Sequence, residues 1–286
     1  MLKNINLGFA VKVGIIGLGL MGGSLAYDMR SKYEDAYIIG FDHNDKHCIE
    51  ALKLGIADKI VDNLSEIKNV DILFLAVPVD AIISIIQNLH DIDTHTTIVD
   101  LGSTKEKIIS SIPDDIRSNF VAAHPMTGTE KSGPTSAIKG LYHGKAVVLC
   151  DIENSGKEHA ELAKEIFENI GMKIFYMEAK EHDKHAAYIS HMPHALSFAL
   201  ATSVMKQENP KAIIALAGGG FRDMSRIAKS SPNMWTDIFR QNKEHLIDAI
   251  ECFEGELDKC KTMVQNQEWE DLYNWMQEAN SLHKIL

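Results

Sequence analysis

Three glycines near the start of the chain, Gly17, Gly19 and Gly22, follow an apolar run in the spacing G-x-G-x-x-G. In this arrangement the first glycine permits a tight turn, the second lets the backbone approach a pyrophosphate, and the third lets a helix pack closely on a strand. The N-terminus of the following helix would offer free N–H groups and a partial positive charge to the phosphates. We therefore expect a dinucleotide to bind here, with Leu20 and Met21 also in contact.

Asp42 bears on which dinucleotide binds. It lies 25 residues after Gly17, at the end of a second apolar run, close to the spacing of the acid that binds the adenosine ribose. A carboxylate accepts a hydrogen bond from a 2′-hydroxyl and repels a 2′-phosphate, and no arginine follows within the next few positions. The sequence therefore predicts NAD rather than NADP. We expect Val77 and Pro78, at the end of another apolar run, to flank the cofactor.

Two polar stretches follow further apolar runs. One is DLGSTK at residues 100–105, and the other is HPMTGTEKSG, which begins at His124. Ligands of an open parallel sheet bind at the carboxyl ends of its strands, so a histidine there would lie beside a nicotinamide. Because imidazole titrates near neutral pH, we interpret His124 as a general base rather than a structural histidine.

The second half of the chain holds further candidates. FRDMSR contains Arg222 and Arg226, and either guanidinium could hold a carboxylate with two parallel hydrogen bonds; their spacing does not choose between them. His191 and His194 are three residues apart and would share one face of a helix. Together with His182 or His185 they could bind a metal, but no acid or cysteine completes a known ligand set. We predict no metal site.

The elements that would position these residues alternate between strands and helices up to about residue 178. Apolar, β-branched runs predict strands at residues 11–16, 36–41, 70–77, 96–101, 120–123, 146–150 and 172–176. Helices are predicted between them at residues 24–30, 45–54, 81–89, 103–111 and 157–169, with Ser103 near an N-cap. This alternation predicts an α/β fold with a Rossmann-type doubly wound parallel sheet, open to antiparallel additions at one edge.

From about residue 179 only helices are expected. They span residues 183–206 with an interruption at Pro193, 210–217, 235–264 and the tail from 269, and glycines 218–220 break the chain. We predict an N-terminal dinucleotide-binding domain of residues 1–178 and an all-α C-terminal domain of residues 179–286. A heptad seam could face either the chain's own core or a second copy, and it is formed by Leu246, Ile250, Phe253, Leu257, Cys260 and Val264.

Composition excludes several classes of protein. The net charge is -11 over 286 residues, which argues against a nucleic-acid partner. The four cysteines are scattered without a C-x-x-C, as expected for reduced thiols of a cytoplasmic protein. No apolar run has the length of a signal segment or a membrane span, so we expect no membrane partner.

In order along the chain, GLGLMGGS, DLGSTK, HPMTGTEKSG, SHMPHALSFAL and GGGFRDMSRIA resemble the prephenate dehydrogenase family, which includes arogenate-using relatives. The resemblance extends from about Val11 to past Trp235. With no chorismate mutase segment and no room for a full ACT domain, the chain resembles the compact, monofunctional form. The resemblance implies NAD-dependent oxidative decarboxylation of prephenate to 4-hydroxyphenylpyruvate in tyrosine biosynthesis.

The resemblance also implies roles for individual residues. His124 matches the base that bonds the substrate hydroxyl, Ser103 the serine that bonds both hydroxyl and histidine, and Arg226 the arginine that holds a substrate carboxylate. Three further matches to the substrate pocket are His194, Thr129 and Glu130, and a fourth, Trp235, could instead pack in the core. Family members are typically dimers joined through the helical domain. The alternatives left open are an arogenate dehydrogenase that forms tyrosine directly and a non-catalytic dinucleotide-sensing dimer.

Overall fold

A single sheet organises the first half of the molecule. The computed structural model describes residues 11–285. Its strands lie in the order β3-β2-β1-β4-β5-β6-β7-β8. They are β1 (Lys12–Ile16), β2 (Tyr37–Phe41), β3 (Lys59–Ile60), β4 (Ile72–Leu75), β5 (Thr97–Asp100), β6 (Phe120–Pro125), β7 (Ala146–Cys150) and β8 (Lys173–Met177). The sheet is parallel from β3 to β6, whereas β7 pairs antiparallel with β6 and parallel with β8. The predicted fold class, including antiparallel strands at one edge, is confirmed.

Helices cover both faces of this sheet, as expected for strands that are apolar on both sides. On one face Met29 of α1 (Leu20–Lys32) and Phe167 of α5 (Lys157–Asn169) belong to one buried apolar cluster, together with Ala51 of α2 (Asp45–Lys53). On the other face Ile82 of α3 (Val79–Ile86) and Ile108 of α4 (Glu106–Ser110) belong to a second. The chain leaves β1 for β2 and β3 and then returns to β4 on the other side of β1. This switch point between β1 and β4 is where open sheets of this type bind nucleotides.

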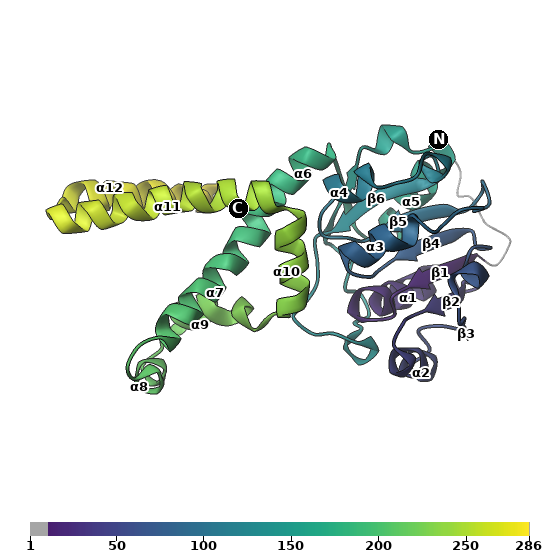
Figure 1. Ribbon diagram of the computed structural model, residues 1–286, viewed down its shortest axis with the longest axis horizontal. Coiled ribbons are helices and arrows are strands. Elements are labelled where there is room, and N and C mark those ends of the chain that lie inside the picture. Colours follow the sequence, from purple (N-terminus) through teal and green to yellow (C-terminus); the bar gives the residue numbers. More distant parts are fainter. Residues whose placement is uncertain (1–10, 286) are drawn as a thin grey trace.

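The second half is helical (Figure 1). It consists of α6 (Ala179–Ala186), a π-helical turn (Ala187–His191), α7 (Met192–Met205), α8 (Pro210–Ala215), α9 (Gly219–Ser225), a 3-10 turn (Arg226–Lys229), α10 (Pro232–Gln241), α11 (Lys243–Asn266) and α12 (Trp269–Ala279). Figure 1 shows α11 and α12 side by side, projecting away from the sheet, with α7 and α9 forming a second arm. Among residues 11–285, no helix combines the length and apolar character needed to cross a bilayer.

Several predicted helix limits were wrong. The helix expected at residues 183–206 is divided by the π-helical turn, which precedes Pro193. The helix expected at 235–264 is two helices separated at Asn242, whose side-chain amide donates to the carbonyl of Asp183 at 2.6 Å. The glycines at 218–220 do not only interrupt the chain, because α9 begins at Gly219. Strand β3 was not predicted, and it has only two residues.

Candidate active site

The glycine turn after β1 has room for a phosphate at one position only. Gly17 has φ of +93°, and a Cβ there would lie 2.4 Å from the carbonyl oxygen of Ala76. A Cβ at Gly22 would lie 1.9 Å from the carbonyl oxygen of Gly17. In contrast, the nearest atom to a Cβ on Gly19 would be 3.8 Å away, in the backbone of Gly133. Helix α1 starts directly after Gly19 with no side-chain cap and no acid in its first turn, so its N-terminus is free for an anion.

Asp42 is fixed at the end of β2, beside this turn. Its carboxylate accepts hydrogen bonds from the backbone N–H groups of Leu18 and Asn44, each at 2.9 Å. The Nδ1 atoms of His47 and His43 lie 3.3 and 3.4 Å from its two oxygens. The side chain is only 6% exposed, so its orientation is set by these contacts. The place of Asp42 relative to the glycine turn fits an adenosine ribose.

Residues 138–142, in the segment between β6 and β7, are hydrogen-bonded to α1. The Tyr142 hydroxyl donates to the carbonyl of Met21 at 2.8 Å, and the hydroxyl of Ser24 accepts from the N–H of Ile138 at 2.9 Å. The carboxylate of Asp28 accepts from the N–H of Gly140 at 2.6 Å. These bonds hold residues 138–142 beside α1, along the stretch from Met21 to Asp28. This segment can therefore form one wall of the cofactor site.

Val77 and Pro78 follow β4, next to the glycine turn. Val77 follows β4, and its Cγ1 would lie 2.7 Å from a Cβ on Gly17. Pro78 is the N-cap residue of α3 and is exposed. The structure thus brings both residues next to the glycine turn across the switch point.

His124 lies inside β6 rather than at the start of the loop, because it pairs with Val148 of β7. Its Nδ1 is 2.8 Å from Nε2 of His182, and the Nδ1 of His182 is 2.8 Å from a carboxylate oxygen of Asp183. Burial and the neighbouring His182 and Lys105 lower the pKa of His124 well below its usual value. The imidazole is therefore neutral at pH 7 and can accept a proton.

A buried ion pair supports the strand end behind His124. The Lys105 ammonium pairs with Asp100, and both side chains are completely buried. The ammonium also donates to the carbonyl of Ala123 at 2.7 Å, and Asp100 accepts from the N–H groups of Ala123 and Gly102 at 3.2 and 2.9 Å. Burial raises the pKa of Asp100, and the charge of Lys105 opposes that rise. The pair locks the ends of β5 and β6 together.

Ser103 lies in the partly exposed loop between these strands and α4. Within residues 11–285 its hydroxyl makes no hydrogen bond to His124, whose Nδ1 faces His182 instead. Helix α4 begins later than predicted, at Glu106, because Asp183 of α6 caps it. The Asp183 carboxylate accepts from the N–H groups of Lys105 and Glu106 at 2.8 and 2.9 Å. Ser103 is thereby left outside the helix.

A second group of candidates comes from the helical part. His194 of α7 stacks on Trp235 of α10, with ring centroids 3.5 Å apart and an interplanar angle of 23°. The Nδ1 of His194 bonds the carbonyl of Ser190 at 2.9 Å, which leaves Nε2 free. Burial lowers the pKa of His194, and the charge of Arg226 lowers it further. Arg226 starts the 3-10 turn, is exposed, and has no ion-pair partner among residues 11–285.

His191 neighbours both His124 and the stacked pair of His194 and Trp235. It is 1% exposed, its ring centroid is 6.1 Å from that of Trp235, and its Nδ1 accepts from the amide of Asn242 at 3.0 Å. Burial lowers its pKa to about 4, so the ring is neutral. The Asp183 carboxylate opposes this lowering of the pKa. His124 and the stacked pair of His194 and Trp235 therefore border one region between the sheet and α7.

Thr129 and Glu130 are exposed on the segment after β6. Glu130 pairs with Lys229 at 2.8 Å, in the turn that starts at Arg226. This ion pair lowers the pKa of Glu130. The structure thus places the two loop residues at the junction between the sheet and the helical part.

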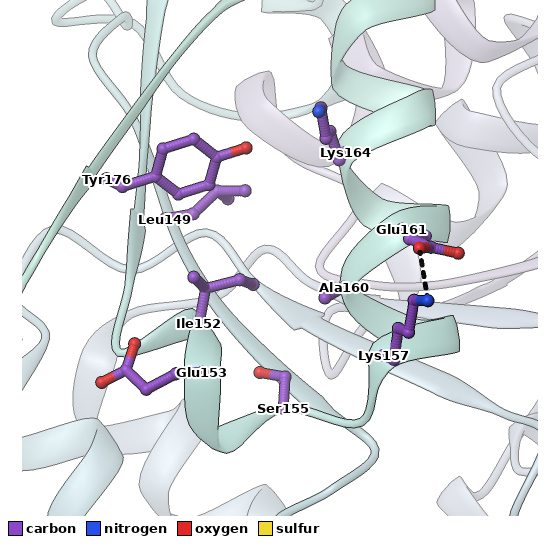
Figure 2. Close-up of a pocket in the computed structure, with 9 residues that line it drawn as sticks. All are labelled: Leu149, Ile152, Glu153, Ser155, Lys157, Ala160, Glu161, Lys164 and Tyr176. Atoms are coloured by element: carbon purple, nitrogen blue, oxygen red, sulfur yellow. Dashed lines mark ion pairs between the residues drawn. The ribbon is translucent and has the colours of Figure 1, made fainter. Parts of the chain in front are cut away.

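A separate hollow of about 370 Å³ lies at the far edge of the sheet, between β7, β8 and α5 (Figure 2). Figure 2 shows the ring of Tyr176 over Leu149, facing Lys164 and the ion pair between Lys157 and Glu161. None of the predicted site residues lines it.

Among residues 11–285 no group of three His, Cys, Asp or Glu side chains is arranged to hold a metal ion.

Sequence reasoning missed four residues that support His124. Asp100 and Lys105 were quoted within DLGSTK without a role, and His182 was considered only as a metal ligand. Asp183 was only the start of a predicted helix. The adjacent His and Asp of KEHDKH were the available signal, but nothing local shows that they meet residues 58 and 78 positions away.

Comparisons with known proteins identify the family of this chain. The chain matches the family models described as "Prephenate dehydrogenase, nucleotide-binding domain" over residues 25–176 and "Prephenate dehydrogenase, dimerization domain" over residues 178–278. A prephenate dehydrogenase of Bacillus subtilis is 33% identical over 93% of this chain and 73% of its own length.

Two solved structures are also similar. Prephenate dehydrogenase from A. aeolicus, in complex with hydroxyphenyl propionate and NAD+, has a TM-score of 0.91 and 34% identity, covering 98% of this chain and 99% of that one. A Synechocystis arogenate dehydrogenase has a TM-score of 0.78 and 28% identity, covering 96% and 99%. On its sequence and its fold, this chain belongs to the prephenate dehydrogenase family.

Proposed function

We propose that the chain is an enzyme that oxidatively decarboxylates prephenate to 4-hydroxyphenylpyruvate with NAD as the hydride acceptor, a step of tyrosine biosynthesis. The observation that carries this proposal is the position of His124 at the carboxyl end of β6, where it bonds His182. His191 acts on His124 and lies with its ring centroid 6.1 Å from that of Trp235, on which His194 stacks. Relatives of at least 30% identity over most of the chain are named prephenate dehydrogenase.

NAD is the cofactor of this reaction, and the residues of the sheet edge fit it. The open face of Gly19 and the uncapped N-terminus of α1 would receive the pyrophosphate, and Asp42 the adenosine ribose. The full set that we assign to the cofactor is Gly17, Gly19, Leu20, Met21, Gly22, Asp42, Val77 and Pro78. The bound nicotinamide supplies the hydride acceptor, and the protein supplies the base and the carboxylate contacts.

His124 is the catalytic base. Its Nε2 accepts the proton of the substrate's ring hydroxyl. At the same time the ring carbon that bears this hydroxyl loses a hydride, that is, a hydrogen with its electron pair. Loss of CO2 then makes the ring aromatic. Because the pKa of His124 is lowered, the lone pair is available at pH 7. Ser103, in the loop after β5, is assigned to the hydroxyl as a second contact.

Arg226 and His194 are assigned to the carboxylates of the substrate. The guanidinium of Arg226 has no competing carboxylate among the described residues, so it is free to form two parallel bonds with a ligand. His194 is held by Trp235 and Ser190 with Nε2 unused. Thr129 and Glu130 would border the mouth of the site.

The proposed domains are residues 1–178, which bind NAD, and residues 179–286, which complete the substrate site and form a homodimer. The family model of the second part is described as a dimerization domain. Apolar side chains exposed on α11 and α12 support the same surface for self-association.

The test is NADH formation, followed by its near-ultraviolet absorbance, with prephenate and arogenate assayed in parallel. Signal on prephenate supports the proposal. Signal mainly on arogenate keeps the chemistry and reassigns the contacts to the substrate side chain. NAD binding without turnover of either compound would favour a dinucleotide-sensing dimer and overturn the assignment of His124 as a catalytic residue.

A further inference from the structure

Three side chains form a hydrogen-bonded row that ends at His124. His124 bonds His182 between Nδ1 and Nε2 at 2.8 Å, and His182 bonds Asp183 between Nδ1 and a carboxylate oxygen at 2.8 Å. The side chains of His182 and Asp183 are 3% and 2% exposed, so bulk water does not compete for these bonds. No step of the proposed mechanism yet uses His182 or Asp183.

The hydrogen-bond partners along this row favour one arrangement of its protons. Burial raises the pKa of Asp183, but hydrogen bonds from His182 and from the N–H of Glu106 more than offset this and hold it below its usual value. An ionised carboxylate only accepts, so the Nδ1 of His182 carries a hydrogen. With that hydrogen on Nδ1, the Nε2 of His182 can accept, and the Nδ1 of His124 can donate to it. The Nε2 of His124 is left with the lone pair that a base needs.

The geometry points to His182 and Asp183 as positioning residues that set the tautomer of His124 and receive its positive charge during turnover. This inference rests on the proposed dehydrogenase function. As the substrate hydroxyl gives its proton to Nε2 of His124, the Nδ1 proton of His124 passes to Nε2 of His182. The oxygen keeps the electron pair of its broken O–H bond and forms the carbonyl as the hydride leaves. The positive charge ends on His182, still bonded to Asp183.

Charges around the row favour this transfer. The groups that face His124 are His182 from α6, His191 from the π-helical turn, and the Lys105 ammonium, which is paired with Asp100. A cation on His124 would stand beside that ammonium, whereas a cation on His182 stands beside the Asp183 carboxylate. In a buried site this difference favours charge on His182.

The remaining charged groups near the row leave this balance unchanged. His191 is neutral, since burial lowers its pKa to about 4. Glu106, at the start of α4, faces His245 of α11 at 3.6 Å and is exposed. Asp183 is therefore the anion that directly contacts His182.

The variant that tests this is His182→Gln, because Asp183 also caps α4 and its replacement would disturb the fold. Its matched control is His185→Gln, an exposed histidine on the same helix. For His182→Gln we expect kcat to fall by about ten- to a hundredfold, with KM and NAD affinity within about threefold of the unchanged protein. The acid limb of the kcat profile should move to lower pH, because a proton can no longer rest beside Asp183. His185→Gln should match the unchanged protein in all four measurements.

A second readout needs neither a variant nor turnover. Nitrogen-15 NMR of the histidine rings in the unchanged, full-length protein should show His124 protonated on Nδ1 and bare on Nε2. His124 found mainly as the Nε2–H tautomer would overturn the inference, as would a His182→Gln protein with unchanged kcat and pH profile. If neither prephenate nor arogenate is turned over, the proposed function fails while the NMR result still decides the tautomer.

Discussion

At the scale of single residues, His124 combines a base's position with a depressed pKa. Replacing it with asparagine keeps a polar group beside His182 but removes the proton acceptor. We expect His124→Asn to lower kcat by about a hundredfold or more and to leave NAD affinity nearly unchanged, since the glycine turn is untouched. Turnover assays and calorimetric titration with NAD measure the two effects. Full activity in this variant would remove His124 from the chemistry.

Arg226 and Arg222 give a matched comparison one helical turn apart. Only Arg226 acts electrostatically on His194, and both are exposed. Losing a charged contact costs about 2–5 kcal/mol, so Arg226→Ala should raise KM for prephenate more than tenfold. Arg222→Ala should leave it near its starting value. The opposite ranking would transfer the carboxylate contact to Arg222.

His191 links a single ring to the pH dependence of folding. Burial lowers its pKa to about 4 in the folded chain, whereas an unfolded histidine titrates near about 6.5. Below that pH the unfolded state binds the extra proton, so stability falls as pH drops from about 6.5 towards 4. His191 alone should contribute a loss of about 2 kcal/mol between roughly pH 7 and pH 5.

Urea unfolding at both pH values measures this loss. His191→Gln, whose amide can still accept from Asn242, should reduce the difference by that amount. An unchanged pH dependence in the variant would mean that the ring is not held neutral.

At the scale of elements, the turn between β1 and α1 offers a position, Gly19, where a substitution should weaken NAD binding without disturbing the packing of the fold. A Cβ on Gly19 would have no close neighbour, because the nearest atom is the backbone nitrogen of Gly133 at 3.8 Å. Gly19→Ala should therefore fold normally but place a methyl group where the pyrophosphate approaches. We expect its NAD dissociation constant to rise at least about tenfold, with little change in melting temperature. Gly255→Ala is the control, because it also adds a methyl without a close neighbour but lies in α11. Equal NAD affinity in both variants would place the phosphates elsewhere.

Local sequence signals identified most of these helices and strands, but not the long-range contacts that join them. Buried strands such as β4 were predictable because a run of consecutive apolar residues can be recognised without knowing its distant partners. The start of α4 was not, because the carboxylate of Asp183 supplies its cap from 77 and 78 positions away. The pairing of His124 with His182 was hidden for the same reason. Sequence thus located the strand ends where chemistry occurs, but long-range contacts decide which side chains meet there.

At the scale of the molecule, several polar contacts join the sheet to the helices around the candidate site. Asp183 of α6 caps α4, Glu130 pairs with Lys229, and Arg240 of α10 pairs with Asp80 at the start of α3. The cofactor residues and His124 come from one side of this junction, and Arg226 and His194 come from the other. Substrate contacts therefore depend on the two parts keeping their relative position.

The projecting helices α11 and α12 carry apolar side chains that stay exposed in the single chain. The heptad seam is buried at Leu246 but exposed farther along α11, where Leu257 is 56% exposed. Large apolar side chains exposed nearby are Val264, Trp269, Tyr273 and Met276. Such a surface is unfavourable in water, and a second copy can cover it through a two-fold interface. We expect light scattering to give twice the chain mass of 31.8 kDa.

Leu257→Glu should shift the protein to monomers, because it would bury a charge in the interface. Ile49→Glu is the control, since Ile49 is similarly exposed, at 53%, but lies on α2 of the sheet domain. Its mass should equal that of the unchanged protein. A monomeric unchanged protein, or a Leu257→Glu dimer as stable as the control, would place the self-association surface away from the seam.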